Sequence, residues 1–228
     1  MKIVCIGRNY ADHAAELGNA VPSEPLFFFK PEGAILHKDH PFAIPEWTRD
    51  CHYEVELVVR INRPAKWMDE GHASRCYSHV GLGIDFTARD VQQELKAAGK
   101  PWEKAKAFDG SAVLSKEWIS LEEVGGDIQD LRFSLLKNGE VVQEGHTADM
   151  LFPVDALIAH VSKYSTWKTG DLLYTGTPAG VGPVQSGDRL EGRLGGRRAP
   201  ARPSRQATQP PLGGNRRLLR TSKGYPWV

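Results

Sequence analysis

The sequence predicts a mainly β domain of the α+β class, with short helices. Short runs rich in β-branched and aromatic residues recur along the chain between glycine and proline residues, as in strands joined by turns. Asn138 and Gly139 stand between two such runs, which is the strongest short-range signal for a β-hairpin. Few segments have apolar residues at helical spacing, so the regular strand–helix alternation of a doubly wound sheet is missing.

The first half of the chain is predicted to alternate strands and helices. The strand KIVCIG ends at Gly7, and RNYADHAAELG follows as a helix of about two turns closed by Gly18. Pro25 and Pro31 flank the segment LFFFK, which we expect to be a short buried strand leading into a loop. HYEVELVVRINR is predicted to be one long strand. In SHVGLGIDFTARDVQQELKAAG a strand runs through Ile84, and a helix begins at about Thr87.

The second half is predicted to be richer in strands. LRFSLLKNGEVVQEG forms the hairpin, and VDALIAHVSKY is a helix with Val154, Leu157, Ile158 and Val161 on one apolar stripe. GDLLYTGTPAGVGPVQSGDRLEG contains a strand, a loop of glycine and proline residues and a further turn. The last strand is expected near residues 188–194.

Charge and composition divide the chain into residues 1–195, predicted to be one domain, and a tail of residues 196–228. All 28 acidic residues lie before residue 192, whereas residues 192–228 contain nine basic residues and no acidic one. The tail is rich in proline and arginine and has no strand-length apolar run, so we expect it to be disordered or aberrant. A nucleic-acid or membrane-surface arm is the alternative. The tail has neither interleaved aromatic residues nor an amphipathic period, so its composition favours such an arm less than a disordered or aberrant segment.

Cysteine usage and the N-terminus indicate a cytoplasmic protein. Cys5, Cys51 and Cys76 are an odd number at wide spacing, which forms neither a disulfide framework nor a CxxC metal site. The first apolar run, IVCIG, is too short for the apolar core of a signal peptide or for a membrane span. We therefore expect no membrane partner.

Three carboxylates are candidates for a metal site. Glu54 and Glu56 lie two residues apart in a predicted strand, so they point to the same face, and Asp85 ends the next predicted strand. Close carboxylates raise each other's pKa unless a cation lies between them. An all-oxygen set selects magnesium, calcium or manganese over zinc. The alternatives are a solvated acidic strand face and Asp85 as a helix cap.

Two further sites are ambiguous from the residues alone. His13 and Glu16 are at i and i+3 of a predicted helix, where a carboxylate can orient the imidazole of a general base. A surface pair on a short helix is the alternative. Lys106 lies beyond Lys100 and Lys104, and a lysine in such a run is most often solvated.

Six motifs occur in an order that resembles one enzyme superfamily: GRNYADH, FFKP, HYEVELV, GIDFTARDVQ, PWEKAKAFDG and YTGTPAGVGP. From about Ile3 to about Gly195 the chain is similar to the fumarylacetoacetate hydrolase superfamily, closest to its small, single-domain acylpyruvase branch. The resemblance implies a mixed β-sandwich roll and a homodimer. It also implies a Mg²⁺ or Mn²⁺ ion held by Glu54, Glu56 and Asp85.

The same resemblance suggests roles for the other candidates. His13 and Glu16 match the water-activating dyad on a helical lid, and Lys106 matches the lysine beside the developing enolate. Four positions match residues that contact the substrate: Arg8, Gln92, Gly176 and Thr177.

The implied activity is metal-dependent cleavage of a carbon–carbon bond in 2,4-diketo acids, acylpyruvates such as fumarylpyruvate or acetylpyruvate, through a pyruvate enolate. Oxaloacetate decarboxylase and an isomerase or decarboxylase of aromatic-acid catabolism are alternatives, because this fold hosts all three. The non-enzymatic alternative is an inactive or misfolded member with a basic binding tail. From about Gly196 the chain departs from the family pattern, in which another turn and a final strand are expected.

Overall fold

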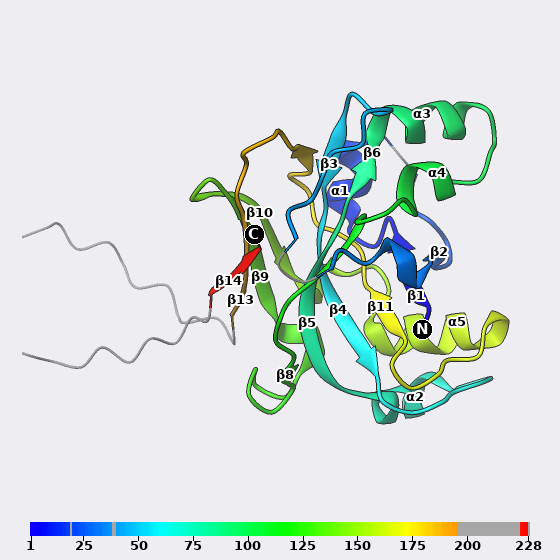
Figure 1. Ribbon diagram of the computed structural model, residues 1–228. Helices are drawn as coiled ribbons and strands as arrows, with labels where there is room; N and C mark the ends of the chain where they lie inside the picture. Colours follow the sequence, from blue (N-terminus) through cyan, green and yellow to red (C-terminus); the bar gives the residue numbers. More distant parts are fainter. Residues whose placement is uncertain (19, 38–39, 196–223, 228) are drawn as a thin grey trace, which may run out of the picture.

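The computed structural model describes residues 1–228 except residues 19, 38–39, 196–223 and 228. The chain is mainly β with short helices, as predicted, and its strands form three mixed or antiparallel sheets within the described residues (Figure 1). No helix among these residues is long and apolar enough to cross a membrane. Cys5, Cys51 and Cys76 are buried free thiols.

The largest sheet of the described residues has seven strands in the order β2-β1-β11-β4-β5-β7, with β8 paired to β5. Strands β1 and β11 are parallel, and the other pairs are antiparallel. The bounds are β1 (Ile3–Gly7), β2 (Leu26–Lys30), β4 (Val55–Ile61), β5 (Tyr77–Asp85), β7 (Ala112–Leu114), β8 (Ile119–Ser120) and β11 (Leu172–Tyr174).

Two smaller sheets complete the fold, in the orders β10-β9-β13-β14 and β12-β3-β6. Their bounds are β3 (Cys51–Tyr53), β6 (Thr87–Ala88), β9 (Arg132–Lys137), β10 (Glu140–His146), β12 (Gly182–Pro183), β13 (Leu190–Gly195) and β14 (Gly224–Trp227). The predicted last strand near residues 188–194 corresponds to β13.

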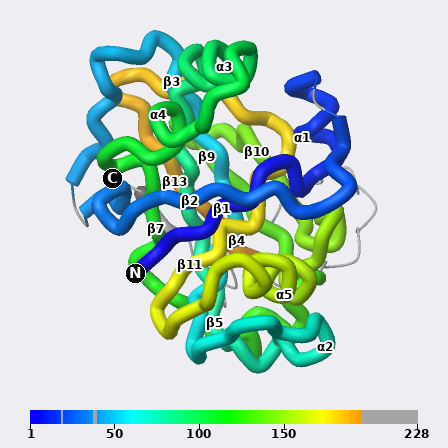
Figure 2. Tube along the Cα trace, turned by 90° about the vertical axis from the view of Figure 1, so that its right-hand side faces the viewer, coloured from blue at the N-terminus to red at the C-terminus, as the bar shows by residue number. Residues whose placement is uncertain are grey.

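The helices lie at two ends of the molecule. In both views α3 and α4 lie at one end, whereas α2 and α5 lie side by side at the other (Figures 1 and 2). Their bounds are α1 (Ala11–Glu16), α2 (Glu70–Ala73), α3 (Arg89–Ala97), α4 (Glu103–Lys106) and α5 (Val154–Tyr164). Short 3-10 turns cover η1 (Glu32–Ala34), η2 (Ser74–Cys76), η3 (Ile128–Asp130) and η4 (Thr147–Asp149).

Two strong sequence predictions are confirmed. The stripe of Val154, Leu157, Ile158 and Val161 on α5 is fully buried in the main core. Asn138 and Gly139 have φ angles of 55° and 90°, so both adopt the left-handed conformation that a tight hairpin between β9 and β10 requires.

The β9–β10 hairpin also contributes to the centre of the molecule. Its register shifts between Val141 and Gln143, and the side chain of Gln143 is buried. The Gln143 amide donates to Thr177 Oγ1 and to the Pro178 carbonyl, each at 2.9 Å, and its oxygen accepts from the Val55 N–H at 2.9 Å. One side chain thus links the hairpin, β4 and the loop that follows β11.

Several predicted boundaries are wrong in detail. The single strand predicted for HYEVELVVRINR is divided at Glu54 into β3 and β4, which belong to different sheets. The helix predicted from Thr87 begins at Arg89, because Thr87 pairs with His52 in a short strand. The first helix begins at Ala11, later than RNY predicts. Strand β2 is mostly half-buried rather than buried, because it is an edge strand.

The tail from about Gly196 is expected to be largely irregular, and its end departs from this expectation. Residues Gly224–Trp227 form β14, which pairs antiparallel with β13. The strand includes Pro226, which has no N–H to donate, and β14 lies at the sheet edge, where proline is tolerated. The rest of that prediction concerns residues 196–223 and 228, which lie outside the described residues.

Gly83 pairs with Glu56 in the β4–β5 ladder. We predict that close packing around this position requires a glycine. A Cβ there would lie 2.5 Å from the buried Tyr174 ring and 2.7 Å from a Val58 methyl group. Gly83→Ala should therefore destabilise the fold by about 1–3 kcal/mol, measured by urea denaturation. As the control, Gly71→Ala in α2 meets open space and should leave stability equal or slightly higher. Equal stability of both variants would contradict this view of the packing.

Candidate active site

The three predicted carboxylates converge. One oxygen each of Glu54, Glu56 and Asp85 lies within 4.8 Å of the others, and the three residues are buried. Glu54 lies at the break between β3 and β4, and the Asp85 N–H donates to its carbonyl at 2.8 Å, which ties the ends of the two strands together. A solvated acidic face is therefore excluded. Asp85 is not the cap of α3 either, since Ala88 occupies the N-cap position.

Buried cations surround two of these carboxylates. Lys106 Nζ lies 2.7 Å from Glu54, 2.8 Å from Asp85 and 2.6 Å from Thr87 Oγ1. Lys30 Nζ lies 2.7 Å from the other Asp85 oxygen, and Arg89 donates to Glu54. Lys106 is 3% exposed, so the solvated alternative for this residue is wrong.

Glu56 differs from its neighbours because it has no such cation. Among the residues that the structure describes, no lysine or arginine forms an ion pair with it, and its Oε2 accepts from the Gly176 N–H at 2.7 Å. Burial, and then the charges of Asp85 and Glu54, raise the pKa of Glu56 well above its usual value. Burial also opposes ionisation of Glu54, but Lys106 and Arg89 outweigh it and hold the pKa of Glu54 well below its usual range.

This donor set fits a divalent metal ion. All the ligand atoms are carboxylate oxygens, which hard cations prefer, and Glu56 is a buried carboxylate without a counter-cation. Three protein oxygens leave coordination positions for water and substrate, as is usual for Mg²⁺. The cofactor that fits is Mg²⁺ or Mn²⁺.

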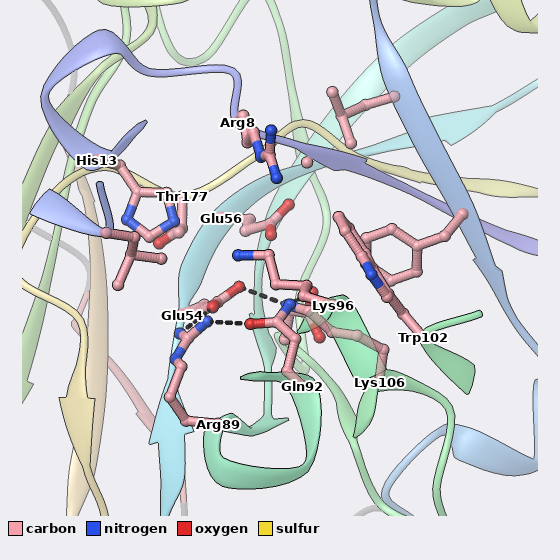
Figure 3. Close-up of a pocket in the computed structure, with 15 residues that line it drawn as sticks. Arg8, His13, Glu54, Glu56, Arg89, Gln92, Lys96, Trp102, Lys106 and Thr177 are labelled. Carbon is pink, nitrogen blue, oxygen red and sulfur yellow. Dashed lines mark hydrogen bonds and ion pairs between the residues drawn. The ribbon is translucent and has the colours of Figure 1, made fainter. Parts of the chain in front are cut away.

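A narrow cavity lies over the carboxylates (Figure 3). His13 and Trp102 lie on opposite sides of it in this view, with Arg8 at its top. The cavity combines the charged cluster with polar, basic and aromatic residues from β1, α1, α3 and the loop after β11. Those outside the cluster include Arg8, His13, Gln92, Lys96, Trp102 and Thr177.

The predicted dyad is present on α1. His13 Nδ1 lies 3.2 Å from Glu16 Oε2, and Glu16 Oε1 accepts from the Gly180 N–H at 3.1 Å. Burial lowers the pKa of His13 although Glu54 and Glu16 act in the opposite direction. The lowered pKa favours the neutral imidazole, and with Nδ1 hydrogen-bonded to Glu16, Nε2 is the nitrogen that can accept a proton.

Of the four residues predicted to contact the substrate, three line the cavity and one does not. Arg8, Gln92 and Thr177 line the cavity, whereas Gly176 lies behind it and donates to Glu56. Gly176 has a φ of 99°, and a Cβ would lie 2.7 Å from the Cβ of Asn9. A glycine is required there so that its N–H can approach the carboxylate.

Sequence reasoning missed three basic residues of the site. Arg89 donates to Gln92 Oε1 at 2.6 Å and to Glu54, so it fixes both side chains. Lys30 lies in the motif FFKP and contacts Asp85 from behind the cavity. Lys96 lines the cavity from α3. A helical stripe through Arg89, Gln92 and Lys96 was the available signal, since these positions share one face of α3.

The family model described as fumarylacetoacetate (FAA) hydrolase C-terminal matches residues 2–202. The chain is 49% identical over 189 residues to the oxaloacetate tautomerase YcgM of Escherichia coli, covering 83% of this chain and 86% of that protein. It is 42% identical over 194 residues to the mitochondrial oxaloacetate tautomerase FAHD1 of Homo sapiens, covering 85% and 87%. A solved fumarylpyruvate hydrolase from Pseudomonas aeruginosa, in complex with Mn²⁺ and pyruvate, has a TM-score of 0.79 and 34% identity, covering 85% of this chain and 84% of that one.

Metal binding should stabilise the protein through Glu56. At a free Mg²⁺ concentration about a hundredfold above Kd, the folded state gains about 2.7 kcal/mol, which raises Tm by about 5–10 °C for a chain of this size. Glu56→Gln should lose this rise while keeping a metal-free Tm at least equal to that of the unmodified chain, because burial, Asp85 and Glu54 disfavour the ionised form of Glu56 and the amide cannot ionise.

The measurement is differential scanning calorimetry with and without Mg²⁺, and the matched control is Glu122→Gln at an exposed position. A full Mg²⁺-dependent rise in Glu56→Gln would show that Glu56 does not bind the ion.

Proposed function

The chain belongs to the fumarylacetoacetate hydrolase family, and from this premise we propose that it is a metal-dependent tautomerase of oxaloacetate-type 2-oxo acids. The observation that carries the proposal is the presence of a neutral base, His13, in one cavity with a buried cluster of carboxylates and the cationic Lys106. Such a cavity suits removal of a proton next to a carbonyl group. Relatives at 42% and 49% identity are named oxaloacetate tautomerases.

In this proposal Glu54, Glu56 and Asp85 hold the divalent ion. The bound ion acts as a Lewis acid on the 2-oxo acid group and stabilises negative charge there. Burial lowers the pKa of Lys106, but Asp85 and Glu54 outweigh burial and raise the pKa above its usual value. The Lys106 side chain is therefore an ammonium ion at neutral pH and places a positive charge beside these two carboxylates. Lys106 thereby stabilises the enolate without acting as an acid.

His13 performs the proton transfer. Its Nε2 takes a proton from C3 of the substrate, the electron pair of the broken C–H bond moves to form the C2–C3 double bond, and negative charge develops on the 2-oxo oxygen. Water then donates a proton to that oxygen to give the enol, and the His13 imidazolium returns its proton to water. Glu16 keeps the tautomer in which Nε2 is the base and stabilises the imidazolium that forms. Arg8, Gln92 and Thr177 contact the substrate, and Gly176 acts through Glu56.

Hydrolysis of acylpyruvates such as fumarylpyruvate or acetylpyruvate is the second candidate. It is favoured by the carboxylate-oriented His13, which is equally suited to activating a water molecule, and by the similarity to a fumarylpyruvate hydrolase. Both reactions share the enolate, and they differ in whether His13 removes a proton from carbon or from water. Oxaloacetate decarboxylation and the isomerisation or decarboxylation of aromatic-acid catabolites share the enolate as well, and need no activated water.

The proposal also covers the domain bounds, the oligomeric state, the partners and the location of the protein. Residues 1–195 form the catalytic domain, and the family match continues to residue 202. The active unit is a homodimer that takes small 2-oxo or 2,4-diketo acids, with no membrane or nucleic-acid partner. The cytoplasm is the proposed location, supported by three free cysteines. Sedimentation velocity and localisation of a tagged chain test these statements.

His13→Gln is expected to lower kcat for oxaloacetate enolisation by about 10²–10⁴-fold, because the general base is lost. The rate is measured from the ultraviolet absorbance of the enol with Mg²⁺ present, alongside hydrolysis of acetylpyruvate and fumarylpyruvate. Metal binding by calorimetry should be unchanged, and His72→Gln on exposed α2 serves as the control. A rate equal to that of the unmodified chain would remove His13 from the mechanism, and activity on acylpyruvates alone would select hydrolysis.

The pH profile should reflect the lowered pKa of His13. The neutral form is the active one, so the midpoint of the decline in kcat/KM with falling pH should lie below 6.5, the usual pKa of histidine. Glu16→Gln removes an interaction that raises this pKa, so the decline should move to lower pH while the level rate falls. Rates between about pH 5 and 8 measure both effects. A decline centred above 6.5 would contradict the assignment.

A further inference from the structure

One wall of the cavity is basic. Arg8 enters from the end of β1 and Lys96 from α3, so that two elements distant in sequence direct positive charge into the same space (Figure 3). Burial first, and then the charges of Arg8 and Arg89, lower the pKa of Lys96. Glu54 acts in the opposite direction. Arg8 and Lys96 both line the cavity, so an anion bound between them would offset the repulsion between their charges.

The backbone at Arg8 supports a functional reason for this arrangement. Arg8 has a φ of 58°, in the left-handed region that bulky residues seldom adopt. Such strain persists where the surrounding structure requires it, and it is typical of ligand sites. Here the conformation turns the chain from β1 into α1 and places the side chain on the cavity.

The charges of the cavity point to the class of ligand. The lining residues include four basic side chains, lysine or arginine, against three carboxylates, and a divalent ion would add two further positive charges. The basic side chains are Arg8, Arg89, Lys96 and Lys106. A monoanionic 2-oxo acid leaves a net positive charge in a confined space, whereas a dianion compensates more of it.

We propose that Arg8 and Lys96 bind the second carboxylate of the substrate, the one distant from the 2-oxo acid group, and so select 2-oxo diacids over 2-oxo acids with a neutral end. This inference rests on the proposed function, because it assigns the far end of the same substrate. Arg8 supplies a planar fork for two oxygens, and Lys96 supplies a point charge on a flexible stem. The apolar side of the cavity, near Trp102, is left for the carbon chain.

The test compares oxaloacetate with 2-oxobutanoate, which has the same number of carbons and a methyl group in place of the second carboxylate. Lys96→Met keeps the length of the side chain and removes its charge. It should lower kcat/KM for oxaloacetate about 10- to 100-fold, mainly through KM, the effect of losing a charge-assisted hydrogen bond. Deuterium exchange at C3 of 2-oxobutanoate, followed by NMR, should fall far less. Lys96→Arg should restore most of the preference.

The matched control is Lys104→Met, on the exposed face of α4, which should leave both substrates unaffected. Equal losses on the two substrates in Lys96→Met would overturn the proposal, because they would indicate a general structural effect. Unchanged kinetics on oxaloacetate would overturn it as well.

A binding measurement separates this proposal from the proposed function. Calorimetric titration of the Mg²⁺-loaded protein with 2-oxoglutarate and with 2-oxopentanoate compares a dianion with a monoanion of equal chain length and needs no turnover. The unmodified protein should bind 2-oxoglutarate more tightly, and Lys96→Met should lose that preference. Equal affinities in the unmodified protein would overturn the subsite, whereas a retained preference without enolisation would overturn only the proposed reaction.

Discussion

The burial of opposite charges in one cluster is the constraint on which the rest of the structure depends. Each ionised group removed from water costs several kcal/mol, and only close, well-oriented partners offset this cost. The cluster contains three cations and three carboxylates: Lys30, Arg89, Lys106, Glu54, Glu56 and Asp85. Among the described residues, lysine or arginine side chains form ion pairs with Glu54 and Asp85 but not with Glu56, which accepts only the Gly176 N–H. A divalent ion beside Glu56 completes the cluster, which relates the fold to the need for a metal.

Paired strands and the loop after β11 hold this cluster in place. Pairing of β4 with β5 brings Glu56 and Asp85 to the same end of the large sheet. The shift of register in the β9–β10 hairpin turns Gln143 inward, where it fixes β4 and the loop after β11. That loop in turn donates the Gly176 N–H to Glu56 and the Gly180 N–H to Glu16. The proposed metal ligand Glu56 and the proposed dyad residue Glu16 are thus held by the same segment, so a shift of the loop would displace both.

Enolate chemistry explains how relatives with different names share one site. In the proposed mechanism a divalent ion held by the three carboxylates would, together with Lys106, stabilise the same negative charge whether a proton, an acyl group or carbon dioxide leaves C3. In this proposal the outcome depends on whether C3 of the substrate or a water molecule lies at Nε2 of His13, and on which substrate end Arg8 and Lys96 bind. These differences involve few side chains, whereas the buried cluster is common to all the reactions. The family and the type of intermediate therefore follow more directly from the structure than the substrate does.

The sequence by itself determined the features that depend on local geometry. Strand alternation placed Glu54 and Glu56 together, helical spacing paired His13 with Glu16, and the Asn138-Gly139 turn fixed a hairpin. The motif order predicted the family, its metal and the three ligands. Tertiary structure alone decided the break of the strand at Glu54, the pairing of β14 with β13 and the burial of Lys30 behind Asp85. These features depend on partners distant along the chain, and no local propensity encodes which distant residue supplies the counter-charge or the neighbouring strand.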